Sequence, residues 1–200
     1  AVGALTLGVG IATAAVWLYS NSTPSTANES TKNEVSSPSS PIILNYRKYA
    51  SERTGSLPRI AITTNNILLK PKGSAYELIP EAVEVLKWLC GLSDVYLITD
   101  VQTDEQENNA TRLLQASGIF TSGMNPCKLL FSEKLDGRIA MIRQIKPILH
   151  IDPSEYVINK LRQFFEGLAL ITPEAKLKKG IFTAASLSQL FPEHQQGARM

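Results

Sequence analysis

The sequence predicts an α/β fold of the Rossmann-like, doubly wound kind, built on a mostly parallel sheet of about five strands. Two observations predict it. Short unbroken apolar runs recur along the chain, as in strands that are buried on both faces. Segments with helical spacing separate these runs, and strand, helix, strand in repetition is typical of one open parallel sheet. We expect residues 59–70 (RIAITTNNILLK), with a turn at Asn65-Asn66, to hold the first and central strand.

The other elements follow in order along the chain. Four further strands are expected at short apolar runs, at residues 94–99, 128–131, 148–151 and 168–171. Helices are expected around them, at residues 80–89, 104–117, 135–146, 154–165 and 184–190. Pro80-Glu81 is a typical helix start, and Asp104 is expected to cap the second helix.

The N-terminal part of the chain differs in composition from the rest. Residues 1–19 carry no charge and, as a helix, reach roughly 28 Å, close to the thickness of the bilayer hydrocarbon. Trp17 and Tyr19 lie where aromatic rings favour the headgroup level, so we expect a retained transmembrane helix, with a cleaved signal peptide as the alternative. Residues 20–40 are rich in Ser, Thr, Asn and Pro and are expected to be a disordered linker. Residues 41–200 are then expected to form a cytosolic Rossmann-like domain.

Composition and motifs argue against several classes of function. A net charge of +2 gives no electrostatic case for nucleic-acid binding. Cys90 and Cys127 are expected to be reduced and structural, as in a cytosolic domain. No Gly-rich phosphate loop follows an expected strand, and the two histidines, His150 and His194, give no zinc-site spacing. We expect no cofactor, no metal and no small-molecule substrate. A Cys127–His150 nucleophile and base pair is conceivable, although His150 better fits a hydrogen-bonded position in the core or at a strand end.

The carboxyl end of the central strand is where ligands and catalytic groups gather in such sheets. Here it offers Thr63, Thr64, Asn65 and Asn66, with no acid, histidine or cysteine. No catalytic residue is expected there.

The order of motifs resembles that of the haloacid dehalogenase-like hydrolases, whose first strand ends in a nucleophilic aspartate and an acid/base aspartate. Laid on that pattern, these two positions fall at Thr63 and Asn65, and the Ser/Thr of the second motif falls at Thr99. The lysine of the third motif falls loosely at Lys134 or Lys128, and Asp152 is a lone acid at the fourth. The resemblance implies the scaffold without a carboxylate nucleophile or a proper magnesium site, because a fold does not carry its function with it.

The chain as a whole is similar to the peroxisome biogenesis protein 22 (peroxin 22) family in its plant form. The segments that carry this resemblance are residues 67–90 (ILLKPKGSAYELIPEAVEVLKWLC) and 94–120 (DVYLITDVQTDEQENNATRLLQASGIF). It implies a single-pass protein of the peroxisomal membrane whose domain faces the cytosol. There it would bind, tether and support a ubiquitin-conjugating enzyme used to ubiquitinate and recycle the matrix-protein import receptor. The alternatives are a membrane-bound haloacid dehalogenase-like phosphatase and an adaptor domain for another client.

The partner surface is not marked by any motif. Interfaces concentrate their energy in a few aromatic or arginine anchors. By helical spacing, Trp88 and Tyr156 lie outside the apolar stripes and Phe164 lies at a boundary, so we expect Trp88, Tyr156 or Phe164 to belong to the partner surface. The alternative for each is packing on a loop or on the C-terminal segment.

Overall fold

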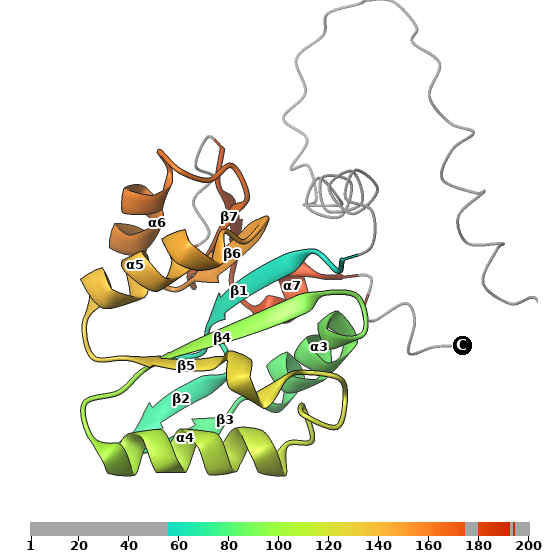
Figure 1. Cartoon of the computed structure of the whole chain (residues 1–200), viewed down its shortest axis with the longest axis vertical. Coiled ribbons are helices and arrows are strands. Elements are labelled where there is room, and N and C mark those ends of the chain that lie inside the picture. Colours follow the sequence, from blue (N-terminus) through green and yellow to red (C-terminus); the bar gives the residue numbers. More distant parts are fainter. Residues whose placement is uncertain (1–55, 175–179, 193, 195–200) are drawn as a thin grey trace, which may run out of the picture. The chain divides into compact units, whose positions relative to one another are not determined.

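The computed structural model describes residues 56–174, 180–192 and 194, which form an open sheet with helices on both faces (Figure 1). The strands of this sheet are β1 (Arg59–Thr63), β4 (Asp94–Asp100), β5 (Leu129–Ser132), β6 (Leu149–Asp152), β7 (Leu168–Ile171) and β8 (Phe182–Ala184). The α-helices are α3 (Pro80–Cys90), α4 (Asp104–Ala116), α5 (Leu135–Ile145), α6 (Glu155–Leu161) and α7 (Leu187–Leu190), and η1 (Pro126–Lys128) is a 3-10 helix.

The N-terminal predictions lie outside the described residues. This applies to the transmembrane helix at 1–19, to the linker at 20–40 and to the start of the domain at residue 41. Within the part of the chain that the structure describes, no helix combines the length and the apolar character needed to cross a bilayer.

The six-stranded sheet has the order β5-β4-β1-β6-β7-β8, and every neighbouring pair is parallel. Ile60 in β1 is paired with Val95 in β4 on one side and with Leu149 in β6 on the other. The prediction of a parallel α/β sheet with its first strand at the centre is therefore confirmed, with six strands in place of about five.

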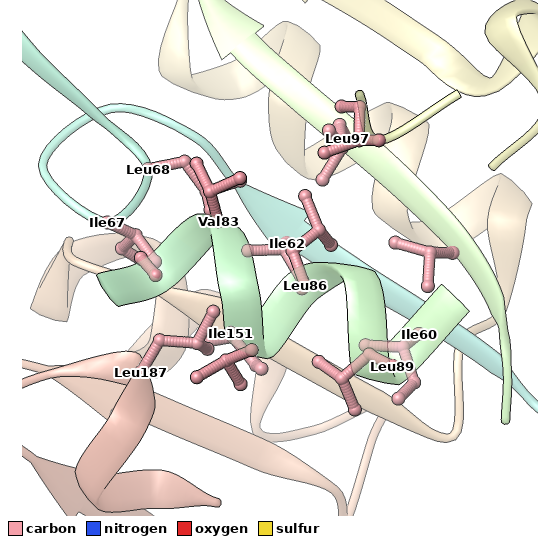
Figure 2. Close-up of a cluster of buried hydrophobic side chains, with 14 of the residues drawn as sticks. Ile60, Ile62, Ile67, Leu68, Val83, Leu86, Leu89, Leu97, Ile151 and Leu187 are labelled. Carbon is pink, nitrogen blue, oxygen red and sulfur yellow. The ribbon is translucent and has the colours of Figure 1, made fainter. Parts of the chain in front are cut away.

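Alternate side chains along a strand pack into two separate apolar layers, one on each face of the sheet. In β4, Val95 and Leu97 face the layer covered by α3, α4 and α7, while Ile98 faces the layer covered by α5 and α6. Figure 2 shows the first layer, in which Leu86 and Leu89 of α3 meet the side chains of the central strands. The helices are thus fixed against opposite faces of the sheet.

The second half of the run at residues 59–70 was predicted wrongly. The strand ends at Thr63, and the carbonyl of Thr64 accepts the N–H groups of Ile67, Leu68 and Leu69 at 3.1, 2.8 and 2.9 Å. Asn66 takes a positive φ of 61°, which turns the chain. The chain then forms an antiparallel hairpin of β2 (Leu69–Lys72) and β3 (Ala75–Leu78), which the sequence analysis missed.

Three other boundaries differ from the prediction. Thr103, not Asp104, caps α4, since its Oγ1 accepts the N–H of Gln106 at 3.3 Å. The helix α6 ends at Leu161, four residues earlier than expected. At the C-terminal end, Ala184 belongs to β8, a strand that the sequence analysis did not predict.

Candidate functional site

The carboxyl edge of the sheet is where the fold would place a catalytic group, and the residues there bind one another. Thr63 ends β1, and its Oγ1 donates a hydrogen bond to Asp152 Oδ2 at 2.7 Å. Asn65 pairs with the backbone of Asp100, donating from Nδ2 at 3.0 Å and accepting through Oδ1 at 2.7 Å. The two positions that hold aspartates in haloacid dehalogenase-like hydrolases therefore serve here to join strand ends.

Arg138 is the central residue of this edge, and the sequence analysis missed it. Its side chain is 2% exposed and bridges Asp100, at the end of β4, to Asp152, at the end of β6. Arg138 Nη1 binds Asp100 Oδ2, and Nη2 donates to Asp152 Oδ1 at 3.3 Å. Nε lies 3.3 Å from Asp152 Oδ2 without hydrogen-bond alignment. A signal existed in the spacing, because Arg138 stands on the buried stripe of α5 with Ile142 and Ile145, at i, i+4 and i+7.

His150 completes the set of groups around Asp152. Its Nδ1 lies 3.1 Å from the carbonyl oxygen of Ala61, and its Nε2 lies 3.1 Å from Asp152 Oδ2. Since a carbonyl only accepts, Nδ1 is the donor in the first contact. The prediction of a hydrogen-bonded core histidine is confirmed. Cys127 is exposed in η1, whereas the His150 ring is buried with both nitrogens engaged, so the Cys127–His150 pair is not assembled.

The environment sets the ionisation of the two acids. Burial acts to raise the pKa of Asp152, but the hydrogen bond and charge of His150, the charge of Arg138 and the hydrogen bond from Thr63 outweigh it and lower that pKa. Burial raises the pKa of Asp100, although the Arg138 charge opposes this. Asp152 also accepts the N–H of Ser154 through Oδ1 at 2.7 Å. Asp152 is therefore a fully engaged structural carboxylate; we call Arg138, Asp100, Asp152 and His150 the ion-pair cluster.

The remaining candidate motif residues are divided between the two edges of the sheet. Thr99 accepts a hydrogen bond from Thr64 Oγ1 at 2.7 Å at the carboxyl edge, and Lys134 follows β5 at the same edge. Lys128 instead precedes β5 and pairs with Asp94 at the start of β4, so it lies at the amino edge. Of the two lysines, only Lys134 has the placement that the third motif requires.

The magnesium ion that haloacid dehalogenase-like hydrolases use does not fit these residues. A guanidinium already balances the carboxylates, both oxygens of Asp152 have donors, and Thr63 supplies a hydroxyl where a carboxylate ligand is needed. Among the described residues, no group of three His, Cys, Asp or Glu side chains is placed to hold a metal.

The three predicted partner residues lie in different places. Trp88 is half-buried on α3 and packs on Phe191, with ring centroids 6.1 Å apart, and on His194, 6.3 Å away. Tyr156 is 48% exposed and Phe164 is 46% exposed, on the side of the sheet covered by α5 and α6. The three therefore do not form one patch, and whether any of them contacts a partner stays a prediction.

Comparison with known proteins gives two matches. The family model described as "Peroxisome biogenesis protein 22, Haloacid dehydrogenase-like domain" matches residues 59–191, which include every strand of the parallel sheet. "Peroxisome biogenesis protein 22" of Arabidopsis thaliana is 34% identical over 113 residues, which are 54% of this chain and 40% of that protein. The chain thus spans less than half of that relative. With two thirds of its residues inside the family model, the chain belongs to the peroxisome biogenesis protein 22 family.

Proposed function

We propose that the protein is a non-catalytic anchor of the peroxisomal membrane that binds a ubiquitin-conjugating enzyme and supports its activity in recycling the matrix-protein import receptor. Membership in a peroxisome biogenesis family supports the cellular process. The ion-pair cluster supports the non-catalytic role, and it is the observation that carries the proposal.

The cluster occupies the place where catalysis would occur. A haloacid dehalogenase-like enzyme needs a free carboxylate to attack the substrate and a cation site to bind phosphate. Here Asp152 is fully buried and bound by Arg138, His150 and Thr63. A domain whose catalytic edge is closed in this way still offers its outer surfaces, so binding a partner is the function that remains.

The predicted membrane anchor would hold the bound conjugating enzyme close to the membrane. Residues 1–19 are expected to span the membrane, and the 20–40 linker, at roughly 25 Å for a random coil, would hold the domain near the surface. Restricting an enzyme to that layer raises its effective concentration near a membrane-bound substrate to about the millimolar range.

The test is direct binding between the full chain and the purified peroxisomal ubiquitin-conjugating enzyme. We expect a complex, and faster ubiquitin discharge by the enzyme when the chain is added. Arg138→Leu, which changes only the interior, should bind as the wild type does under conditions where circular dichroism shows that it is folded. Absence of binding, together with metal-dependent phosphatase activity that Asp152→Asn abolishes, would replace the anchor by the phosphatase alternative.

Topology gives a separate prediction. A domain that faces the cytosol leaves Asn21 and Asn28 unmodified, although both stand in glycosylation acceptor triplets. Asn109 also stands in such a triplet and is likewise expected to stay unmodified; its Oδ1 accepts the Tyr76 N–H at 2.8 Å in the folded domain. Glycan found on Asn21 or Asn28 in the native cell would place the domain in the secretory lumen.

A further inference from the structure

Two hollows adjoin at the amino edge of the sheet, opposite the ion-pair cluster. One, of about 340 Å³, lies where β1 and β4 begin, and the other, of about 590 Å³, lies where β6 and β7 begin. Both are lined by Lys146 and Ile148, so they lie next to each other. We call the two together the amino-edge groove and define it by Arg59, Lys128, Arg143, Lys146, Ile148 and Phe164.

The groove carries an excess of positive charge. Its lining holds four cations, Arg59, Lys128, Arg143 and Lys146, against two carboxylates, a balance of +2 (4 − 2). Lys128 is paired with one of these acids, Asp94.

The structure shows no carboxylate partner for the other three cations, Arg59, Arg143 and Lys146, among the residues that it describes. Arg59 Nη1 donates to the carbonyl of Ile145 at 3.1 Å, a contact that leaves the positive charge unbalanced. The groove therefore attracts a negatively charged partner.

An aromatic side chain lies beside these charges. Phe164 is 46% exposed, and the Arg143 guanidinium stands 4.3 Å from the centre of its ring. Leu57, 56% exposed, lines the other end of the groove. An arginine stacked on an exposed ring is the kind of anchor that interfaces use, because covering the ring with an apolar group removes both from water.

The shape and the charge together select the occupant. A membrane surface is flat, whereas these hollows are concave, with volumes of about 340 and about 590 Å³. The chain's own segment at residues 41–55 is itself basic, with Arg47, Lys48 and Arg53 against Glu52, so like charge disfavours it.

We propose that the amino-edge groove receives an acidic segment of the ubiquitin-conjugating enzyme, with an apolar side chain of that segment seated against Phe164. This inference rests on the function proposed above and adds to it the location and the chemistry of the contact. Of the three aromatic residues that the sequence singled out, it selects Phe164.

The experiment measures binding of the full chain to the purified conjugating enzyme. In one variant, Arg143→Gln with Lys146→Asn removes two charges; asparagine tolerates the left-handed backbone of Lys146, whose φ is 52°. We expect affinity to fall about tenfold, and about a hundredfold in Arg143→Glu with Lys146→Glu. Phe164→Ala should also weaken binding by about tenfold or more. Raising the ionic strength from about 0.05 to about 0.5 M should weaken wild-type binding more than binding of the neutralised variant.

The other end of α6 supplies a matched control. Lys160 Nζ stands 5.5 Å from the centre of the Tyr156 ring, and Tyr156 is 48% exposed, so the chemistry and exposure resemble those of Arg143 and Phe164. The control variant, Lys160→Gln with Tyr156→Ala, should bind within about twofold of wild type. Near-ultraviolet circular dichroism checks that each variant is folded.

Four results would overturn the inference, and they separate it from the proposed function. If the wild type binds the enzyme and the groove variants bind it equally well, the groove is not the binding site, although the proposed function still holds. A control variant that weakens binding equally shows that location does not matter. If the groove variants lose binding to phosphatidylserine vesicles but still bind the enzyme as the wild type does, the groove is a membrane contact. A wild-type chain that does not bind the enzyme ends both proposals.

Discussion

Replacing Arg138 by leucine should lower the free energy of unfolding by about 3–5 kcal/mol, because it removes the guanidinium that pairs with Asp100 and Asp152. The Arg138 side chain is 2% exposed, Asp152 is 0% exposed, and the Asp100 side chain is 26% exposed. Most of the penalty therefore falls on Asp152, since water partly screens Asp100. For a domain of this size, the melting temperature should fall by about 10 °C.

The pH dependence identifies charge as the cause. In the wild type, the pKa of Asp152 is lowered, so its stabilising contribution is present above the unfolded-state pKa and is lost as pH falls through the folded-state pKa. Without Arg138, the pKa values of Asp152 and Asp100 rise, and the raised pKa of Asp100 makes the folded variant bind protons at higher pH than the unfolded chain. Its stability then increases as pH falls from neutrality. The raised pKa of Asp100 also makes stability increase as pH falls, both in the wild type and in the variant.

The assay is urea unfolding of both proteins at about pH 7.5 and about pH 5, where the difference should be largest at the higher pH. Arg143→Leu, on the same helix but exposed, is the control, with an expected change under about 1 kcal/mol. Adding Asp152→Asn to Arg138→Leu should restore part of the stability, because the amide needs no counter-charge. A loss that is the same at both pH values would assign the effect to packing volume, and the electrostatic reasoning would be wrong.

Three further predictions concern other parts of the domain. Gly167→Ala should cost about 2–4 kcal/mol in urea unfolding, because its Cβ would stand 1.9 Å from the Ile148 carbonyl oxygen; wild-type stability would show that the backbone yields there. Cys127 should react with a thiol reagent in the native protein and Cys90 only on unfolding, since burial raises the pKa of Cys90 to about 11; equal rates would contradict this. Calorimetry should show no tight Mg²⁺ binding, and micromolar affinity lost in Asp152→Asn would reopen the enzyme hypothesis.

The sequence predicts the sheet well where runs are apolar throughout. All four residues of Leu168–Ile171 are buried, as expected for a strand between two helical layers. The prediction failed where the same signal has another cause. Ile67–Leu69 are as apolar as a strand, yet their N–H groups converge on the Thr64 carbonyl. Phe182–Ala184 was missed because it is three residues long with a polar centre.

The candidate site was predicted in part. Thr63, Asn65 and Asp152 were placed correctly at the carboxyl edge, because the ends of parallel strands meet there. Arg138 was missed because a charged residue on an apolar stripe has no partner that sequence alone can name. Its two acids lie 38 and 14 residues away along the chain, and only the sheet order brings them together.

The central position of β1 has a consequence for how the chain folds. Its partner β4 follows soon after, but its other neighbour, β6, is so distant that Thr63 and Asp152 are 89 residues apart. During synthesis, the N–H and C=O groups along one edge of β1 therefore stay unpaired until most of the domain has left the ribosome. Closing so long a loop costs chain entropy before any native contact repays it, which makes the β1–β6 pairing a slow step. A chain that stops before β6 would leave the buried strand β1 as an exposed edge, open to pairing with another copy.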